Sequence, residues 1–149
     1  MTTRTAYLKQ VKGNSFVGKS NSNHWVSMDV SEEFGGNDAA CTPKELLLLS
    51  LAGCTSSDVV SILQKKRVKF RDFEVNISAD LCGDHPKVYT RIDLEYVVYG
   101  DDINPKDVER AIELSQTKYC GVTAMLKNTV EINHSYRIET TQEIAPAIV

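Results

Sequence analysis

The chain has 149 residues, of which 42% are hydrophobic and 25% are charged, as in a typical folded domain. This length provides one proper hydrophobic core and is short for two, so we expect a single domain over residues 1–149. The formal net charge of −3 gives no reason to expect nucleic acid as a partner.

The N-terminal segment and the cysteines point to a cytoplasmic location. The first ten residues lack the apolar stretch of a secretory signal. The apolar run from Leu46 is interrupted at Ser50 and is expected to fall short of a membrane span, so no membrane partner is expected. In the cytoplasm the four cysteines would be core residues, metal ligands or redox groups and would not form a disulfide scaffold.

The first thirty residues predict three strands followed by a polar loop. The strands cover about residues 4–12, 15–20 and 24–30, and turn signals separate them at Gly13-Asn14 and at residues 21–23. The loop that follows contains Gly35-Gly36.

A long helix is predicted to begin at Thr42. Thr42, Pro43 and Glu45 have the spacing of a capping box, in which the threonine and the glutamate satisfy each other's backbone N–H groups. From Leu46 to Leu63 the segment is apolar on almost every face, so other elements should surround it. One small sheet gives too little cover, which suggests a homodimer whose two sheets enclose the helices.

The second half of the chain predicts two strands, a helix and a last strand. Alternation places strands at about 70–81 and 87–100, with a hairpin loop between them. A second helix should start after Asn104 and continue to about residue 126, with an interruption near Gly121. A strand at 129–140 and a frayed tail complete an α+β fold with a largely antiparallel sheet.

Cys54 and Cys120 are the candidates for chemistry. They lie on the two predicted helices, beside Gly53 and Gly121 respectively. Two such thiols can reduce a peroxide: one thiolate takes an oxygen and becomes a sulfenic acid, and the other condenses with it to a disulfide. Buried cysteine is also a common small hydrophobic residue, and that interpretation stays open.

A metal site is a further alternative for the same cysteines. Cys54 and Cys120 could combine with His24 and His134, although no pair of these residues has the spacing of a zinc motif. We expect no metal or other cofactor.

Two cysteine-centred segments resemble the OsmC/Ohr superfamily, which includes organic hydroperoxide reductases. They are "TPKELLLLSLAGCTSSDVVSILQKK" and "AIELSQTKYCGVTAMLKNTVEINHSYRI", and they look most like the OsmC-like, YhfA-type branch. The resemblance implies an intertwined homodimer in which antiparallel sheets enclose two central helices. It also implies that Cys54 is the peroxidatic thiol, that Cys120 resolves it, and that a small dithiol or a lipoyl-bearing protein is the reductant.

The resemblance also directs attention to Glu45. Strongly active members have a glutamate directly after the proline that starts the helix, but here that position is Lys44 and the carboxylate is one residue further on. On an ideal helix Glu45 lies about half a turn round from Cys54. Glu45 is therefore a candidate catalytic residue, with the capping box as its simpler role.

The same members place an arginine between early strands, close to the thiol. This chain has no arginine between Arg4 and Arg67. Lys19 is the best-placed substitute for the missing positive charge, although lysine lacks the forked geometry of arginine. A solvated strand residue is the alternative interpretation of Lys19.

Two functions follow. The first is a cysteine-based peroxidase that reduces small organic hydroperoxides, because apolar surroundings at Cys54 favour these over hydrogen peroxide. The alternative is a binding protein with little or no turnover that holds a small apolar or electrophilic ligand at the dimer interface.

Overall fold

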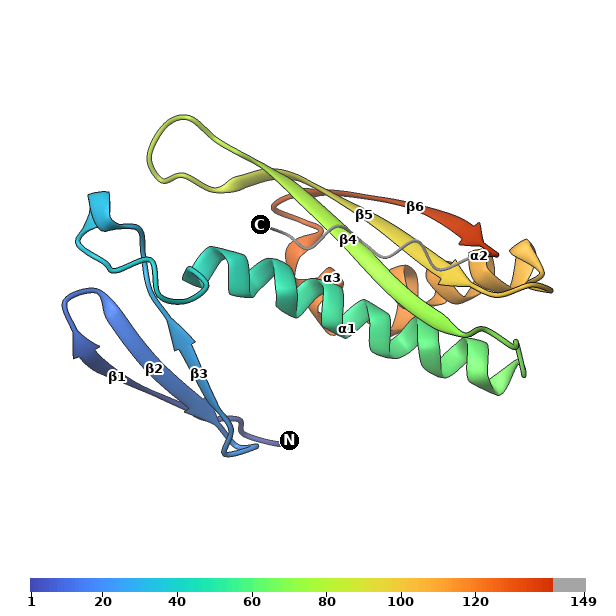
Figure 1. Cartoon of the computed structure of the whole chain (residues 1–149), viewed down its shortest axis with the longest axis horizontal. Coiled ribbons are helices and arrows are strands. Elements are labelled where there is room, and N and C mark those ends of the chain that lie inside the picture. Colours follow the sequence, from blue (N-terminus) through green and yellow to red (C-terminus); the bar gives the residue numbers. More distant parts are fainter. Residues whose placement is uncertain (141–149) are drawn as a thin grey trace. The chain divides into compact units, whose positions relative to one another are not determined.

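The computed structural model describes residues 1–140, and the predicted frayed tail lies outside these residues. The chain divides into two compact units, Met1–Leu49 and the part from Ser50 onward, and each contains one three-stranded sheet (Figure 1). The predicted α+β class is confirmed.

The sheet of the first unit has the strands that the turn signals predicted. It comprises β1 (Ala6–Lys12), β2 (Ser15–Ser20) and β3 (Trp25–Met28), in that spatial order and all antiparallel. Gly13 has φ +56° in the β1–β2 turn, a left-handed conformation that glycine adopts without a steric cost.

The loop after β3 is organised around the buried carboxylate of Asp29. This carboxylate accepts the backbone N–H groups of Val30 at 2.8 Å, Asn37 at 3.2 Å and Ala39 at 3.3 Å. Burial alone would raise the pKa of Asp29, but these hydrogen bonds outweigh it and hold the pKa below the usual value. Gly36 is needed here because a Cβ would lie 1.8 Å from the Val30 carbonyl oxygen.

The long helix α1 (Pro43–Lys65) begins with the predicted capping box. The Thr42 N–H donates to Glu45 Oε2 at 2.6 Å, and the Glu45 N–H donates to Thr42 Oγ1 at 3.3 Å. By length and composition alone α1 could cross a bilayer, so the expectation that the apolar run is too short was wrong on length. The core helix of a soluble protein passes the same test, and a single such helix is weak grounds for a membrane location.

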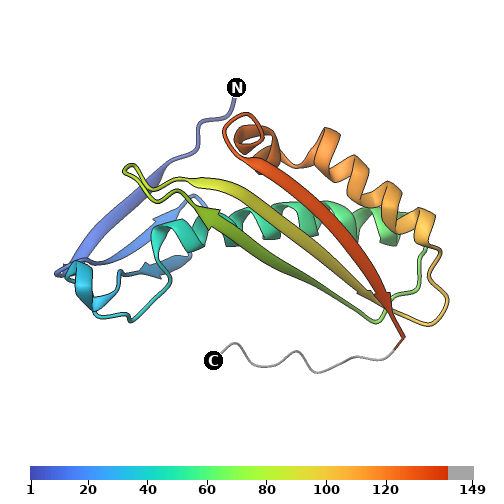
Figure 2. The ribbon, with the colours of Figure 1, turned by 90° about the horizontal axis from the view of Figure 1, so that it is seen from above.

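The second unit contains the part of α1 after Leu49 and all the remaining elements. These are β4 (Asp72–Leu81), β5 (Tyr89–Tyr99), α2 (Pro105–Leu114), the π-helical turn η2 (Ser115–Tyr119), α3 (Gly121–Leu126) and β6 (Glu131–Glu139). Asn104 caps α2, as predicted, by accepting the N–H of Lys106 at 3.1 Å. Figures 1 and 2 show α1 and α2 on the same face of the β4–β5–β6 sheet.

The last strand runs parallel to its neighbour, whereas the other strand pairs have the predicted antiparallel direction. β4 and β5 form an antiparallel hairpin, but β6 pairs with β5 in parallel, with Ile92 opposite Ile132 and Tyr96 opposite Tyr136. The α2–η2–α3 segment is the crossover that a parallel pair requires (Figure 2). Alternation along a strand reports which side chains are buried and carries no information about the direction of its neighbour.

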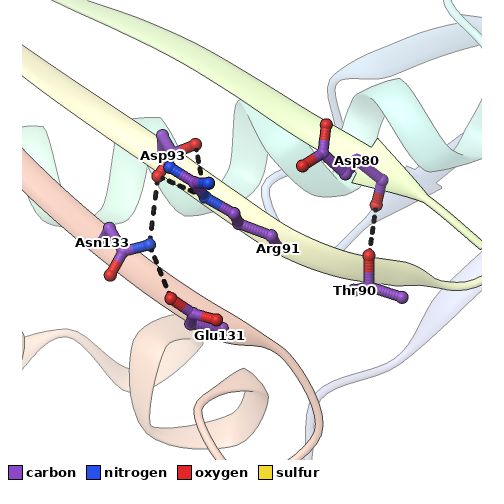
Figure 3. Close-up of polar contacts among 6 residues, drawn as sticks. All are labelled: Asp80, Thr90, Arg91, Asp93, Glu131 and Asn133. Atoms are coloured by element: carbon purple, nitrogen blue, oxygen red, sulfur yellow. Dashed lines mark hydrogen bonds and ion pairs between the residues drawn. The ribbon is translucent and has the colours of Figure 1, made fainter.

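The two faces of this second sheet have opposite character. Ile92, Leu94 and Tyr96 are buried, as their alternation predicted. Polar side chains line the opposite face, where the Arg91 guanidinium bonds Asp93 at 2.9 Å and Asn133 donates to the same carboxylate at 3.1 Å (Figure 3). The Arg91 hydrogen bond is the main reason why the pKa of Asp93 lies below its usual value. We interpret this face as a set of cross-strand polar pairs at the solvent.

Candidate functional site

The structure brings Cys54 and Cys120 together in the second unit. Cys54 is half-buried at the middle of α1, and the Cys120 side chain is only 3% exposed. Cys54 is near enough to raise the pKa of the Cys120 thiol, and both are free thiols. The more accessible thiol is therefore a neighbour of the more buried one, an arrangement in which the second sulfur can react with the first.

A change of helix type determines the position of Cys120. The backbone passes from α2 through the π-helical turn η2 and becomes extended at Cys120, with φ −71° and ψ 104°. The Cys120 N–H donates to the Ser115 carbonyl at 2.9 Å, which closes the wide turn. We predicted an interruption near Gly121. The structure places the break at Cys120, so this residue is the N-cap of α3 and is not inside a helix.

Thr123 holds the sulfur of Cys120. The Thr123 N–H donates to Cys120 Sγ at 3.3 Å, and the Thr123 hydroxyl is near enough to lower the pKa of that thiol. Burial raises the pKa of the Cys120 thiol, the two Thr123 donors lower it, and the neighbouring Cys54 raises it again. The net effect is a raised pKa, so Cys120 is a protonated thiol at neutral pH.

A connected set of polar side chains lies next to the two cysteines, inside the core. Thr55, which is fully buried, contacts the Tyr96 hydroxyl at 2.7 Å and the Ser115 hydroxyl at 2.8 Å. Ser115 donates to Asp58 Oδ2 at 3.0 Å. The set, which we call the core polar network, consists of Thr55, Asp58, Tyr96, Ser115, Gln116 and Thr123.

Gln116 joins the two halves of this network. Its amide nitrogen is 3.1 Å from Thr55 Oγ1 and 2.7 Å from the Tyr96 hydroxyl, and its amide oxygen is 3.4 Å from the Thr123 hydroxyl. Burial raises the pKa of Tyr96, although its bonds to Thr55 and Gln116 oppose this, so Tyr96 is a neutral hydroxyl. No buried side-chain nitrogen or oxygen within residues 1–140 lacks a partner.

The other two predicted site residues have partners of their own in the first unit. The Glu45 carboxylate closes the capping box at the start of α1. The Lys19 ammonium donates to Asn23 Oδ1 at 2.8 Å and lies 5.0 Å from the centre of the Trp25 ring. These contacts account for both residues structurally, and a catalytic part for either stays a prediction.

Several polar neighbours of Cys54 on α1 are also engaged elsewhere. The Ser57 hydroxyl donates back to the Gly53 carbonyl at 2.9 Å, a bond that a serine inside a helix commonly makes. The Asp58 carboxylate accepts from Ser115. Within residues 1–140 no group of three histidine, cysteine or acidic side chains could hold a metal ion, so Cys54, Cys120, His24 and His134 do not form a cluster.

A cavity of about 300 Å³ opens beside the network, between α1 and the α2–η2 segment. Asp58, Ile62, Lys65, Leu114 and Tyr119 line it, together with Ser61. Tyr119 is 52% exposed and contributes to this wall. Two other aromatic residues lie elsewhere: Trp25 contacts Tyr7 within the first sheet, and Tyr136 donates to Glu109 at 2.6 Å.

Sequence reasoning missed most of the core polar network. The available signal was a polar residue in an inward-facing position: Thr55 directly follows Cys54, Thr123 lies three residues after Cys120, and Tyr96 shares the buried phase of β5. Gln116 and Ser115 gave no such signal, because only the π-helical turn directs both toward α1.

The chain matches the model of OsmC-like proteins over residues 35–135. It is 40% identical over 133 residues to the protein YhfA of Escherichia coli K12, an alignment that covers 89% of this chain and 96% of YhfA. The crystal structure of a hypothetical protein from Aquifex aeolicus VF5 superposes with a TM-score of 0.83 at 29% identity, covering 95% of this chain and all of that one.

An organic hydroperoxide resistance protein OsmC from Legionella pneumophila has the same fold at 16% identity. Its TM-score is 0.66, and the match covers 89% of this chain and 96% of the other. The chain thus has an α+β fold with one thiol on α1 and another at the start of α3. It also matches the family model over most of its length. The chain belongs to the OsmC-like family.

Proposed function

We propose that this protein is a thiol-dependent peroxidase that reduces small organic hydroperoxides. The Cys54 thiolate attacks the terminal oxygen of the hydroperoxide, the O–O bond breaks, and the alcohol leaves after taking up a proton. Cys54 is then a sulfenic acid, and the peroxide has accepted two electrons. Cys54 suits the first step because it is the more accessible of the two facing thiols.

Cys120 performs the second step. Its thiolate attacks the Cys54 sulfur, a disulfide forms, and the hydroxide that leaves takes up a proton to become water. A small dithiol or a lipoyl-bearing protein then reduces the disulfide by thiol exchange. The observation that carries this proposal is the pairing of a half-buried thiol, Cys54, with a buried thiol, Cys120, whose pKa it raises.

The proposed substrate class rests on related proteins and on the cavity. Family members from Legionella pneumophila and Elizabethkingia anophelis are named organic hydroperoxide resistance proteins. The cavity between α1 and the α2–η2 segment has apolar walls formed by Ile62, Leu114 and Tyr119. Apolar walls favour an alkyl group over hydrogen peroxide.

We further propose that the protein is a cytoplasmic homodimer. The first sheet leaves large apolar side chains exposed, among them Tyr7, Leu8, Val11 and Trp25. On α1, Leu47 and Leu49 are exposed as well. Analytical ultracentrifugation should give about 33 kDa, twice the 16.6 kDa of one chain. A compact monomer would contradict the dimer.

Stopped-flow consumption of cumene hydroperoxide with dithiothreitol tests the peroxidase proposal. The wild type should consume this substrate faster than hydrogen peroxide, and Cys54→Ser should abolish the reaction. Cys82→Ser is the matched control, because Cys82 is a half-buried thiol in the β4–β5 hairpin loop. If wild type and Cys54→Ser react equally slowly but bind the hydroperoxide, the protein is a binding protein and not a peroxidase.

A further inference from the structure

The hydroxyl group of Thr123 lies between two acceptors. It is near Cys120 Sγ, to which the Thr123 N–H donates at 3.3 Å and whose pKa the hydroxyl lowers, and it is 3.4 Å from the amide oxygen of Gln116. A threonine hydroxyl has a single hydrogen, so it donates to one of these acceptors at a time. Thr123 is 3% exposed, and the choice is therefore made without direct competition from bulk water.

The rest of the network fixes which end of the Gln116 amide faces Thr123. Three hydroxyl hydrogens are available for three contacts, which run from Tyr96 to Thr55, from Thr55 to Ser115, and from Ser115 to the carboxylate of Asp58. An ionised carboxylate accepts only, so every hydroxyl must donate toward Asp58.

This order uses all the hydroxyl hydrogens of the chain of contacts. The remaining contacts, to Thr55 at 3.1 Å and to Tyr96 at 2.7 Å, need two N–H donors, and the Gln116 amide nitrogen supplies both. Reversing the amide would leave at least one contact without a hydrogen. The amide oxygen of Gln116 therefore faces Thr123 as an acceptor.

We propose that Thr123 is a positioning residue for Cys120, and that its hydroxyl hydrogen moves from Gln116 to the sulfur when Cys120 becomes a thiolate. The proposal rests on the proposed resolving role of Cys120. While Cys120 is a thiol, Thr123 donates to Gln116 and can accept the S–H. Once the proton has left, the hydroxyl rotates, and it joins the Thr123 N–H in holding the sulfur at the start of α3, against Cys54.

The groups around the sulfur are consistent with a need for this donor. Cys54 on α1 and Tyr96 on β5 both interact electrostatically with Cys120. The carboxylate of Asp58 on α1 lies beyond Ser115. Each of these groups, when negative, disfavours a thiolate at Cys120, whereas the two Thr123 donors favour it.

The test measures the ionisation of Cys120 and the rate of disulfide closure. Ultraviolet titration uses a chain in which Cys41, Cys54 and Cys82 are serine. In this background Thr123→Val, which keeps the shape and removes the hydroxyl, should raise the apparent pKa of Cys120 by about one unit, because a hydrogen bond to a charged group is lost. Thr123→Ser should restore the original value.

The proposed role and general damage to the core predict different directions for the shift in the apparent pKa of Cys120. Gln116→Met removes the competing acceptor, so it should lower the apparent pKa of Cys120, whereas a purely structural role would shift both variants the same way. Thr117→Val is the matched control, since the Thr117 hydroxyl donates to the Glu113 carbonyl at 2.7 Å, and it should change nothing. Unfolding curves confirm that each variant is folded, and the Thr123 pair is sufficient if Gln116→Met does not fold.

Closure is measured with diamide, which adds to one thiol and is displaced by the second. At pH 7 Thr123→Val should close the Cys54–Cys120 disulfide about tenfold more slowly than wild type and Thr123→Ser. An unchanged titration and an unchanged closure rate in Thr123→Val would overturn the inference. Because diamide needs no peroxidase activity, a wild type that ignores hydroperoxides would refute the proposed function alone.

Discussion

Replacing Thr55 by valine tests whether the core polar network stabilises the fold. The change keeps the shape of a fully buried side chain and removes a hydroxyl that has three partners, at 2.7 Å, 2.8 Å and 3.1 Å. In the variant the Tyr96 hydroxyl loses its acceptor, and one N–H of Gln116 loses its partner. Ser115 keeps Asp58.

The expected loss of stability follows from these two hydrogen-bond donors, which are left without partners. A buried donor without a partner costs about 1–3 kcal/mol, so for the two donors we expect the free energy of unfolding to fall by about 2–6 kcal/mol. Urea unfolding at a fixed protein concentration measures this change, because an oligomer's stability depends on concentration. Thr90→Val is the control: Thr90 is exposed on β5, its hydroxyl bonds the Asp80 carbonyl at 3.3 Å (Figure 3), and it should change stability by less than about 0.5 kcal/mol. Equal effects of the two variants would refute the reasoning.

Three further predictions concern the proposed site. Because burial raises the pKa of Cys120, disulfide closure should accelerate from pH 7 to pH 9. The free energy of unfolding should fall above about pH 8.5, where the thiol ionises in the unfolded chain but not in the folded one. A closure rate independent of pH would count against this. Glu45→Ala should lower the free energy of unfolding by about 1 kcal/mol by opening the capping box, and Glu45→Gln should recover most of it in the same urea experiment. If Lys19 supplies the positive charge for Cys54, Lys19→Ala should slow oxidation of Cys54 by cumene hydroperoxide about threefold to tenfold, whereas Lys9→Ala on β1 should not; equal rates would remove Lys19 from the site.

Local patterns predicted the elements of this fold well. Alternation on β5 identified Ile92, Leu94 and Tyr96 as buried, and the Thr42–Glu45 spacing identified the start of α1. Both signals depend on residues within a few positions of one another, where the backbone fixes which side chains share a face.

Features that depend on distant segments were not predictable in this way. The parallel pairing of β6 with β5 is decided by the crossover between them, so the prediction of a largely antiparallel sheet could not identify this one parallel pair. Val97 and Tyr99 are buried although they alternate with the predicted inward set, so the pattern could not identify them. The π-helical turn that sets Cys120 and Gln116 toward α1 also has no sequence signal of its own.

The candidate site was likewise only partly predictable from the sequence. Pairing Cys54 with Cys120 came from their matched positions and from the family resemblance, and in the structure Cys54 is near enough to Cys120 to raise its pKa. The hydroxyl and amide groups around them were missed because each is an ordinary polar residue until the fold assembles it with the others. Their importance lies in mutual distances of 2.7–3.4 Å between α1, β5, η2 and α3.

Peptide mapping after a single turnover tests the central claim most directly. The fully reduced protein would receive one equivalent of cumene hydroperoxide, be blocked with an alkylating reagent, and be digested without reductant. We predict one new disulfide-linked peptide pair that joins Cys54 to Cys120, with Cys41 and Cys82 alkylated. In Cys120→Ser the Cys54 peptide should instead carry a sulfenic acid that dimedone traps. Recovery of Cys54 and Cys120 as alkylated thiols after the peroxide has been consumed would contradict the account.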